Sequence, residues 1–404
     1  MNICFLTENY YRGGLDTFIV NLINSWPDKS DNITLVCNVS HAGLINIESR
    51  LNTPVFIKKY SYLFTSKMAQ FGELKNGGHS SLVQKLFAMA YRLLQYPVLF
   101  PLYIFASYIC FKKSSYDRLM VINGGYPGSL LGRASIIGWR LSGKPKLGIL
   151  NFHNSTIAPP WYYAIFEYII DRLIIGSANC LISVSENSTT SLKIRPAFAD
   201  YDKNYYIYNG ISKPMVSKGN FPGVGDDEKY CLMLATYEKR KGHSFLLEAF
   251  TYVLKSKPTI KLHIYGHGSP DEVAGVISEI EKLGLAGNVT CHDFVSDPTP
   301  LLSRASVLVV PSQEHESFGL TIIEAMSLGI PVVATNIGGI PEVFGDSRIG
   351  ILCQKDDPRG FGDAIVRILN DEALAAELGH NGINAFQERF SAEAMSLAYR
   401  EILR

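Results

Sequence analysis

The sequence predicts an α/β protein of two successive domains, each built on a mainly parallel sheet, and three observations predict it. The length of 404 residues is too great for one comfortable core and suits two domains. Short β-branched runs alternate with longer helical patterns, as they do in proteins with parallel sheets. This alternation restarts after 213–229, a stretch rich in Gly, Pro, Ser and charge that has the composition of a linker.

The expected strands of both halves are short, and helical patterns separate them. In the first half they are 3–7, 33–39, 55–57, 118–122, 146–152, 180–184 and 205–208, with helices such as 16–25 and 162–176 between them. In the second half they are 230–235, 261–265, 289–292, 307–310 and 331–334, with helices 244–256, 271–283 and 321–328. Two such units predict ligand binding outside the carboxyl ends of the strands. A last helical pattern, 385–404, has no obvious place in the second domain.

Composition excludes several classes of protein. The chain is 47% hydrophobic and 19% charged, which describes a folded protein and not a disordered one. Lys and Arg (38) nearly balance Asp and Glu (37), so no overall field would recruit nucleic acid. The seven Cys form no CxxC pair or Cys/His cluster, which favours reduced thiols and gives no support for a structural zinc. Residues 1–7 lack the basic region of a signal peptide, so we expect a cytoplasmic protein.

One apolar stretch, 93–111, contains no charge and lies between Arg92 and Lys112. Its length approaches the roughly 20 residues that cross a bilayer. Pro97 and Pro101 interrupt it, however, and an expected strand of the same domain follows directly. A membrane crossing is therefore rejected.

Two interpretations of this stretch stay open. It is either a buried helix pair that closes the first domain or a surface that dips into the inner leaflet of a membrane. We favour the second, because aromatic residues accompany basic ones. The expected peripheral contact with anionic lipid spans 82–113, and its basic residues are Lys85, Arg92, Lys112 and Lys113.

The most informative motif starts at Glu316 and ends at Glu324. It follows the expected strand 307–310, and Gly319 lies where a helix begins. A helix start presents unpaired backbone N–H groups and the positive end of a dipole, which suits a phosphate. Glu316 would then lie in the loop, and Glu324, about one turn into the helix, would reach a ribose hydroxyl. The alternative is that Glu316 is a capping residue and Glu324 a solvated helix residue.

Three more loops follow expected strands and are weaker signals. The basic run Lys239-Arg240-Lys241-Gly242 suits a departing diphosphate, although it is equally an ordinary basic turn. Gly266-His267-Gly268 permits close backbone approach but is as an isolated motif more often a tight turn. Arg12-Gly13-Gly14 precedes a helix and offers backbone N–H groups. His153 ends the strand 146–152, where a lone His is more often structural than catalytic.

Together these residues resemble glycosyltransferase family 4, the large group of retaining enzymes with the GT-B fold. The resemblance is densest over 230–358 and rests on the Glu-x7-Glu motif, on Val309-Val310-Pro311-Ser312 before it, and on the runs 324–335 and 338–342 after it. It implies two Rossmann-like domains that face each other across a cleft. It also implies that the C-terminal helix crosses back to the first domain, which provides a place for 385–404.

The resemblance implies a division of labour between the domains. Residues 1–212 with 385–404 would bind the acceptor, and residues 213–384 would bind a nucleotide sugar. The donor-binding residues would be Gly13, Gly14, Thr236, Gly266, Phe318, Gly319, Leu320, Thr321 and Glu324, and the catalytic ones Glu316, His153, Lys241 and Arg240. The family has an Arg where this chain has Thr236, and we expect Arg240 to replace it.

The implied activity is a retaining, metal-independent transfer of a hexose-type sugar from a nucleotide diphosphate, UDP being favoured, with no cofactor. The acceptor would be a glycan or a polyprenyl-linked intermediate of surface polysaccharide biosynthesis. The leaving diphosphate would take the acceptor's proton, so the protein's task is to position and to stabilise charge. The alternatives are a non-catalytic nucleotide-sugar-binding subunit, suggested by Thr236, and a nucleotide-sugar 2-epimerase on the same fold.

Overall fold

The structure is a computed structural model that describes residues 1–10, 12–61, 91, 93–143, 147–215 and 228–404. The chain forms two compact units. Unit 1 contains Met1–Tyr208 and Met395–Arg404, and unit 2 contains Asn209–Ala394.

Unit 1 is built on a parallel sheet of seven strands in the order β3-β2-β1-β4-β5-β6-β7. In chain order the strands are β1 Asn2–Thr7, β2 Asn32–Asn38, β3 Phe56–Tyr60, β4 Arg118–Asn123, β5 Gly148–Phe152, β6 Cys180–Ser183 and β7 Asn204–Tyr206. The central strands are buried along most of their length, as is usual where helices cover both faces of a parallel sheet.

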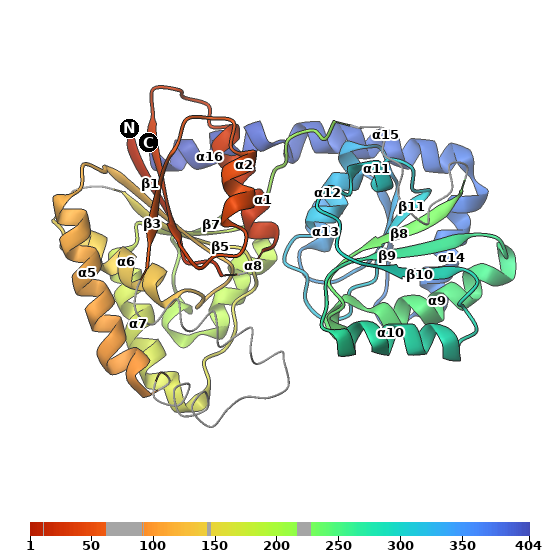
Figure 1. Ribbon diagram of the computed structural model, residues 1–404, viewed down its shortest axis with the longest axis horizontal. Coiled ribbons are helices and arrows are strands. Elements are labelled where there is room, and N and C mark those ends of the chain that lie inside the picture. Colours follow the sequence, from red (N-terminus) through yellow and green to blue (C-terminus); the bar gives the residue numbers. More distant parts are fainter. Residues whose placement is uncertain (11, 62–90, 92, 144–146, 216–227) are drawn as a thin grey trace. The chain divides into compact units, whose positions relative to one another are not determined.

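Helices cover both faces of this sheet (Figure 1). One face carries α1 Gly14–Asn24, α2 Leu44–Arg50 and α16 Ala392–Leu403. The other face carries α5 Phe100–Lys113, α6 Leu130–Leu141 and α7 Ala164–Ser177. Among the described residues, unit 1 also contains α8 Glu186–Ser191, the π-helical turn η1 Gln95–Leu99, and the 3-10 turns η2 Trp161–Tyr163, η3 Leu192–Ile194 and η4 Pro196–Phe198.

Unit 2 repeats the plan with a parallel sheet of six strands in the order β10-β9-β8-β11-β12-β13. The strands are β8 Tyr230–Leu234, β9 Lys261–Tyr265, β10 Val289–His292, β11 Val307–Val310, β12 Val332–Thr335 and β13 Gly350–Cys353. The helical elements are η5 Lys239–Lys241, α9 His243–Ser256, α10 Pro270–Lys282, α11 Thr299–Leu302, α12 Leu320–Ser327, α13 Ile340–Phe344, α14 Pro358–Asn370 and α15 Glu372–Arg389. In both sheets the order reverses beside the first strand, which is the arrangement that opens a binding crevice at the carboxyl ends of the strands.

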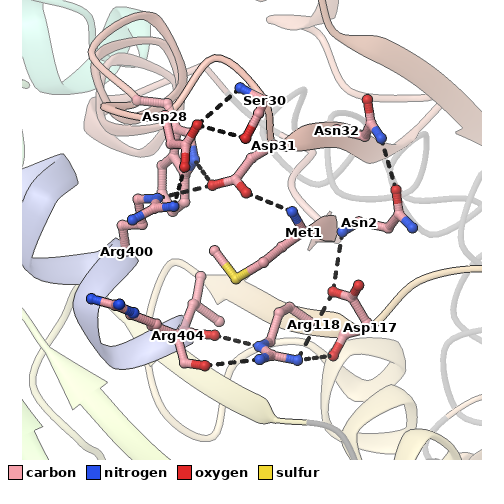
Figure 2. A network of polar contacts seen from close by, with 12 residues as sticks. Met1, Asn2, Asp28, Ser30, Asp31, Asn32, Asp117, Arg118, Arg400 and Arg404 are labelled. Atoms are coloured by element: carbon pink, nitrogen blue, oxygen red, sulfur yellow. Dashed lines mark hydrogen bonds and ion pairs between the residues drawn. The ribbon is translucent and has the colours of Figure 1, made fainter.

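The C-terminal helix α16 packs on unit 1, as predicted. Its residues Met395, Tyr399 and Leu403 are buried in the core beside α1 and α2, and the Tyr399 hydroxyl accepts a hydrogen bond of 2.7 Å from the Asn151 amide. Figure 2 shows the polar contacts that fasten it: Arg400 pairs with Asp28 and, at 2.9 Å, with Asp31. The Arg118 guanidinium donates to the carbonyl oxygens of Leu403 and Arg404.

The predicted α/β architecture is confirmed, and several details differ. The pattern 385–404 is not one helix, because α15 ends at Arg389 and α16 begins at Ala392. The first of these helices packs on α12 and α14, so residues 385–394 belong to unit 2. Strand β13 was not predicted. Its short Gly350–Cys353 run follows a loop and lacks a strong β-branched signal.

The apolar stretch 93–111 forms η1 and most of α5. Leu99, Phe100, Tyr103 and Phe111 are buried, whereas Leu102, Phe105 and Ile109 are exposed. Across the described ranges, no helix combines the length and apolar character that a membrane crossing needs. The predicted contact surface 82–113 falls partly outside the described residues, which exclude 82–90 and Arg92, and with them Lys85.

Candidate functional site

In unit 2, the predicted catalytic residues Lys241 and Glu316 lie together at the carboxyl ends of adjacent strands. Lys241 ends the 3-10 turn after β8, and Glu316 lies in the loop after β11. The Lys241 ammonium donates to the Glu316 carboxylate at 2.5 Å, and both side chains are about one-sixth exposed, at 17% and 15%. The pair is therefore accessible enough to exchange partners with a ligand.

Close backbone packing brings these two loops together. The Gln313 N–H donates to the Arg240 carbonyl at 2.9 Å. Gly242 has a φ of 79°, and a Cβ there would lie 2.0 Å from the Pro311 carbonyl oxygen. Only glycine fits both conditions, so Gly242 allows Lys241 to reach Glu316.

A third loop, after β12, fixes the backbone of Glu316. The Gly339 N–H donates to the Glu316 carbonyl at 2.8 Å. Gly338 has a φ of 57°, and a Cβ there would lie 2.1 Å from the same carbonyl oxygen. The Thr335 hydroxyl donates to the Ser312 carbonyl at 2.5 Å. The Gly338-Gly339 run, which follows the Glu-x7-Glu motif in the sequence, thus packs against the backbone of Glu316 and holds it in place.

Helix α12 begins beside this pair without a side-chain cap. Gly319 is its N-cap, with a φ of 91°, and has no side chain that could accept a hydrogen bond from the first turn. The N–H groups of Leu320 and Thr321 have no acceptor one turn earlier, as in any helix start, so they suit an anion. Glu324 lies half-buried in the second turn.

The side chain of Phe318, a predicted donor-binding residue, is buried within unit 2. It is 2% exposed, and its ring packs edge-on against Phe390 at 5.8 Å between centroids. A role in donor binding would therefore use its backbone and not its ring.

Thr236, which lies where a cation was expected, is hydrogen-bonded to a neighbouring carboxylate. The Thr236 hydroxyl donates to Glu238 at 2.9 Å, and the Arg240 Nε donates to the same carboxylate at 2.6 Å. Burial acts to raise the pKa of Glu238, but the hydrogen bond and charge of Arg240 outweigh it and lower that pKa. A second Arg240 nitrogen lies 3.5 Å from the carbonyl of His315, the neighbour of Glu316. Arg240 thus lies at the same edge of the sheet as Lys241.

The Gly266–Gly268 turn lies at the same edge. A Cβ on Gly266 would lie 1.8 Å from the Ala235 carbonyl oxygen, and one on Gly268 would lie 2.6 Å from the Tyr237 Cβ. The Tyr237 N–H donates to the His267 carbonyl at 3.0 Å. Both glycines are therefore required by contact with the 235–237 segment of this chain.

In unit 1 the predicted residues are Gly13, Gly14 and His153. Gly13 is the uncapped N-cap of α1, in extended backbone, and a Cβ there would have no heavy atom of the described residues within 4 Å. His153 follows β5, and its ring lies edge-on to Phe18 of α1 at 4.2 Å. Burial lowers the pKa of His153 to about 3. Its buried Nε2 has no hydrogen-bond partner among the described residues, so this is a neutral imidazole with one nitrogen that no described residue uses.

Sequence reasoning missed a glycine-rich loop beside His153. Residues 123–129 read Asn-Gly-Gly-Tyr-Pro-Gly-Ser and connect β4 to α6. Asn123 is 2% exposed, and within the described part of the chain neither its amide nitrogen nor its amide oxygen has a partner. The His153 N–H donates to the Asn123 carbonyl at 3.2 Å. The glycine content directly after an expected strand was the signal that could have identified this loop.

Each unit therefore offers a polar strand edge of a different kind. Unit 2 presents cations, a carboxylate and an uncapped helix start, which together suit a phosphorylated ligand with hydroxyl groups. Unit 1 presents exposed glycines at a helix start and a neutral imidazole, which suit an uncharged polar ligand.

Known proteins match this chain in sequence and in fold. Residues 220–385 match the family model described as Glycosyl transferases group 1. A D-inositol 3-phosphate glycosyltransferase of Segniliparus rotundus is 32% identical over 66% of this chain and 64% of its own length. The capsular polysaccharide biosynthesis glycosyltransferase CapM of Staphylococcus aureus is 31% identical over 56% of this chain and 61% of its own length.

Solved structures share the fold over the whole chain. HepE of Anabaena, crystallised with UDP and glucose, superposes with a TM-score of 0.73 at 19% identity, covering 100% of this chain and 99% of its own. TarM, a further structure, gives a TM-score of 0.69 at 16% identity, covering 100% of this chain and 99% of its own. The GT-B fold predicted from the sequence is thereby confirmed. The chain spans about half to two thirds of the curated relatives it matches, and these matches support the glycosyltransferase family.

Proposed function

We propose that this chain is a retaining glycosyltransferase that moves a hexose-type sugar from a nucleotide diphosphate, with UDP favoured, to a glycan or polyprenyl-linked acceptor. The observation that carries the proposal is the Lys241–Glu316 pair beside the uncapped start of α12. Cation, carboxylate and helix N–H groups at one sheet edge match the diphosphate and the hydroxyls of such a donor. The relatives that transfer sugars, and HepE with its UDP, support the choice of ligand.

The diphosphate would be held by Lys241, Arg240 and the N–H groups of Leu320 and Thr321. On arrival it would compete with Glu316 for the Lys241 ammonium, which leaves Glu316 able to accept hydrogen bonds from the sugar. Glu324 would accept from the ribose, while Gly266 and the backbone of Phe318 would complete the donor site. These assignments follow the charges and the positions of the residues within unit 2.

Unit 1 would supply the remaining contacts with the ligand. Gly13 and Gly14 would donate backbone N–H groups, and His153 would contact the sugar. Because burial keeps the pKa of His153 at about 3, its imidazole is uncharged at neutral pH and is suited to hydrogen bonding. We therefore assign it to positioning and not to proton transfer.

In the proposed reaction the bond between the anomeric carbon and the leaving phosphate oxygen breaks through an oxocarbenium-like state. The acceptor oxygen forms its bond to the same face of the sugar, and its proton passes to the leaving phosphate. Configuration is retained without a nucleophile or base from the protein. The protein contributes positioning and stabilisation of the departing charge, and we propose that no metal or cofactor takes part.

Surface polysaccharide biosynthesis in the cytoplasm is the proposed setting, and CapM supports it. Two alternative functions remain candidates. Thr236 lacks the charge of the expected Arg and favours a non-catalytic nucleotide-sugar-binding subunit. A 2-epimerase on this fold is the other.

A panel of nucleotide sugars separates these functions. The proposal expects nucleotide release that depends on acceptor and persists with a metal chelator, with the anomeric configuration retained in the product by NMR. Donor-induced thermal stabilisation without nucleotide release would instead identify a binding subunit. Conversion of the free nucleotide sugar to its 2-epimer would identify the epimerase, and either result would overturn the proposal.

A further inference from the structure

The outer face of α7 is apolar although the helix lies on the surface of unit 1. Trp161, which leads into α7, is 87% exposed, and Ile165 is 77% exposed. Ile169 and Leu173 continue the exposed stripe at helical spacing. Single exposed apolar residues are ordinary, but a continuous stripe of this size marks a contact surface.

The same helix turns its acids inward. Glu167 and Asp171 are each 2% exposed and lie on the opposite side of α7 from the stripe. Glu167 accepts from the Arg133 guanidinium at 2.9 Å and also from Arg195, and Asp171 accepts from Arg195 at 2.8 Å. This arrangement is the reverse of an ordinary surface helix, in which charge faces water.

Helix α5 lies on the same side of the sheet as α7 (Figure 1), and it also carries exposed apolar side chains. Its exposed residues Leu102, Phe105 and Ile109 repeat at helical spacing, while both α5 and α7 pack on the buried helix α6. Tyr96, in η1 just before α5, contacts the start of α7. Its ring lies 4.8 Å from that of Tyr163 and stacks at 5.8 Å on Phe166. We call this combined surface the α5–α7 face; it is defined by Leu102, Phe105, Ile109, Trp161, Ile165 and Ile169.

The charges of the α5–α7 face are of one sign. Lys112 and Lys113 end α5, and Arg172 is exposed on α7. Helix α5 contains no acid, and the two acids of α7 are the buried pair described above. Aromatic and aliphatic side chains with cations and no exposed carboxylate are the composition of a helix that lies at the surface of an anionic membrane.

We propose that the α5–α7 face binds the interfacial layer of an anionic lipid bilayer, with Trp161, Ile165 and Ile169 inserted among the acyl chains and Lys112, Lys113 and Arg172 at the headgroups. This surface lies within unit 1 and does not depend on glycosyl transfer. It shifts the contact predicted for 82–113 onto α7, a helix that the sequence did not implicate. A second copy of the chain fits less well, because a symmetric contact would bring these cations together without a carboxylate partner.

Tryptophan fluorescence tests the proposal in the full chain. The sequence has three Trp, and Trp26 and Trp139 are each 1% exposed, so a response to added vesicles would come from Trp161. Vesicles of phosphatidylcholine with phosphatidylglycerol are expected to shift its emission to the blue, and brominated acyl chains to quench it. Vesicles of phosphatidylcholine alone are expected to do so more weakly.

Variants separate lipid binding from other contacts. Ile165→Ser combined with Ile169→Ser is expected to lower the partition coefficient on anionic vesicles about tenfold or more, because apolar area is lost from exposed positions that the fold does not use. Arg172→Glu is expected to remove the preference for anionic over neutral vesicles. Ile45→Ser is the matched control, since Ile45 is 79% exposed on α2, which covers the other face of the sheet.

Three outcomes would overturn the proposal. One is Trp161 emission that no vesicle changes. Another is equal loss of binding in the Ile45→Ser control. The third is a concentration-dependent dimer, seen by sedimentation, that the double variant abolishes while vesicle binding is absent.

Discussion

Both units hold carboxylates against cations, but they do so in opposite settings. In unit 1, Arg133 and Arg195 meet Glu167 and Asp171 with every one of the four side chains at most 3% exposed. The Tyr126 hydroxyl donates a further hydrogen bond of 2.8 Å to Asp171. In unit 2, Lys241 meets Glu316 at a strand edge, where each is about one-sixth exposed.

The difference shows what burial does to an ion pair. Two guanidiniums and two carboxylates balance in the first network, and burial there makes an exchange of partners costly. Burial acts to raise the pKa of Glu167, but the charge and hydrogen bonds of Arg133 outweigh it and lower that pKa. The pair in unit 2 has one ammonium and one carboxylate with partial access to water, so a charged ligand can take the place of either. The first arrangement is suited to holding α7, the second to binding.

The largest expected effect is on stability, in the buried network. Arg195→Met removes a cation that is 0% exposed and leaves Glu167 and Asp171 short of a partner. We expect the free energy of unfolding to fall by about 3–5 kcal/mol, measured by denaturant titration. Arg172→Met, on the exposed side of the same helix, should change it by less than about 0.5 kcal/mol. Equal effects of the two changes would contradict the assignment of the network.

The next effect is on turnover, in unit 2. Glu316→Gln keeps the shape of the side chain but removes the charge that would face the sugar. We expect turnover to fall about 100-fold, which corresponds to about 2.7 kcal/mol. The free energy of unfolding should be nearly unchanged, because Lys241 retains access to water. Turnover at the level of the unchanged protein would reject the proposed role of Glu316.

A smaller effect distinguishes the two basic neighbours of Lys241. Arg240→Ala removes the guanidinium that lies 3.5 Å from the His315 carbonyl, whereas Lys239→Ala changes an exposed residue of the same turn. We expect kcat/KM to fall about tenfold for Arg240→Ala and to stay within about twofold for Lys239→Ala. If both changes have the same effect, Arg240 does not replace the cation missing at Thr236.

His153 is a third case beside the two ion pairs, because it is a buried group with no hydrogen-bond partner among the described residues. Burial lowers the pKa of His153 to about 3 from 6.5, so the unfolded chain takes up a proton first as the pH falls. The effect of His153 on the free energy of unfolding is as follows: that free energy keeps its full value above pH 6.5 and falls progressively below it. The slope approaches about 1.4 kcal/mol per pH unit. Unfolding curves across this range should show a steeper loss in the unchanged protein than in His153→Gln. Parallel curves would contradict this.

Periodicity was enough to predict every strand of the two sheets except β13, and the helix over 162–176, because strand and helix spacing are local properties. Which face of that helix is buried was not predictable, because apolar side chains lie on both faces and the helix has only two acids. The partners that bury Glu167 and Asp171 come from residues 133 and 195, far away in sequence.

The candidate site likewise has features that the sequence predicted and features that it could not predict. The spacing of Glu316 and Glu324 indicated the loop and the helix start, and the structure contains both. The contact between Lys241 and Glu316 spans 75 positions, and the support of Glu316 by Gly338 depends on a third loop. Both are set by strand order and were inaccessible to spacing alone.

The return of α16 to unit 1 has a consequence for synthesis. Unit 2 is one uninterrupted stretch, Asn209–Ala394, whereas unit 1 is completed only by Met395–Arg404. Domains fold from the N-terminus onward as the chain emerges from the ribosome. Unit 2 can therefore finish folding while the core of unit 1 still lacks Met395, Tyr399 and Leu403. The domain made first is the one completed last, and until then its α1–α2 side remains exposed to proteases and chaperones.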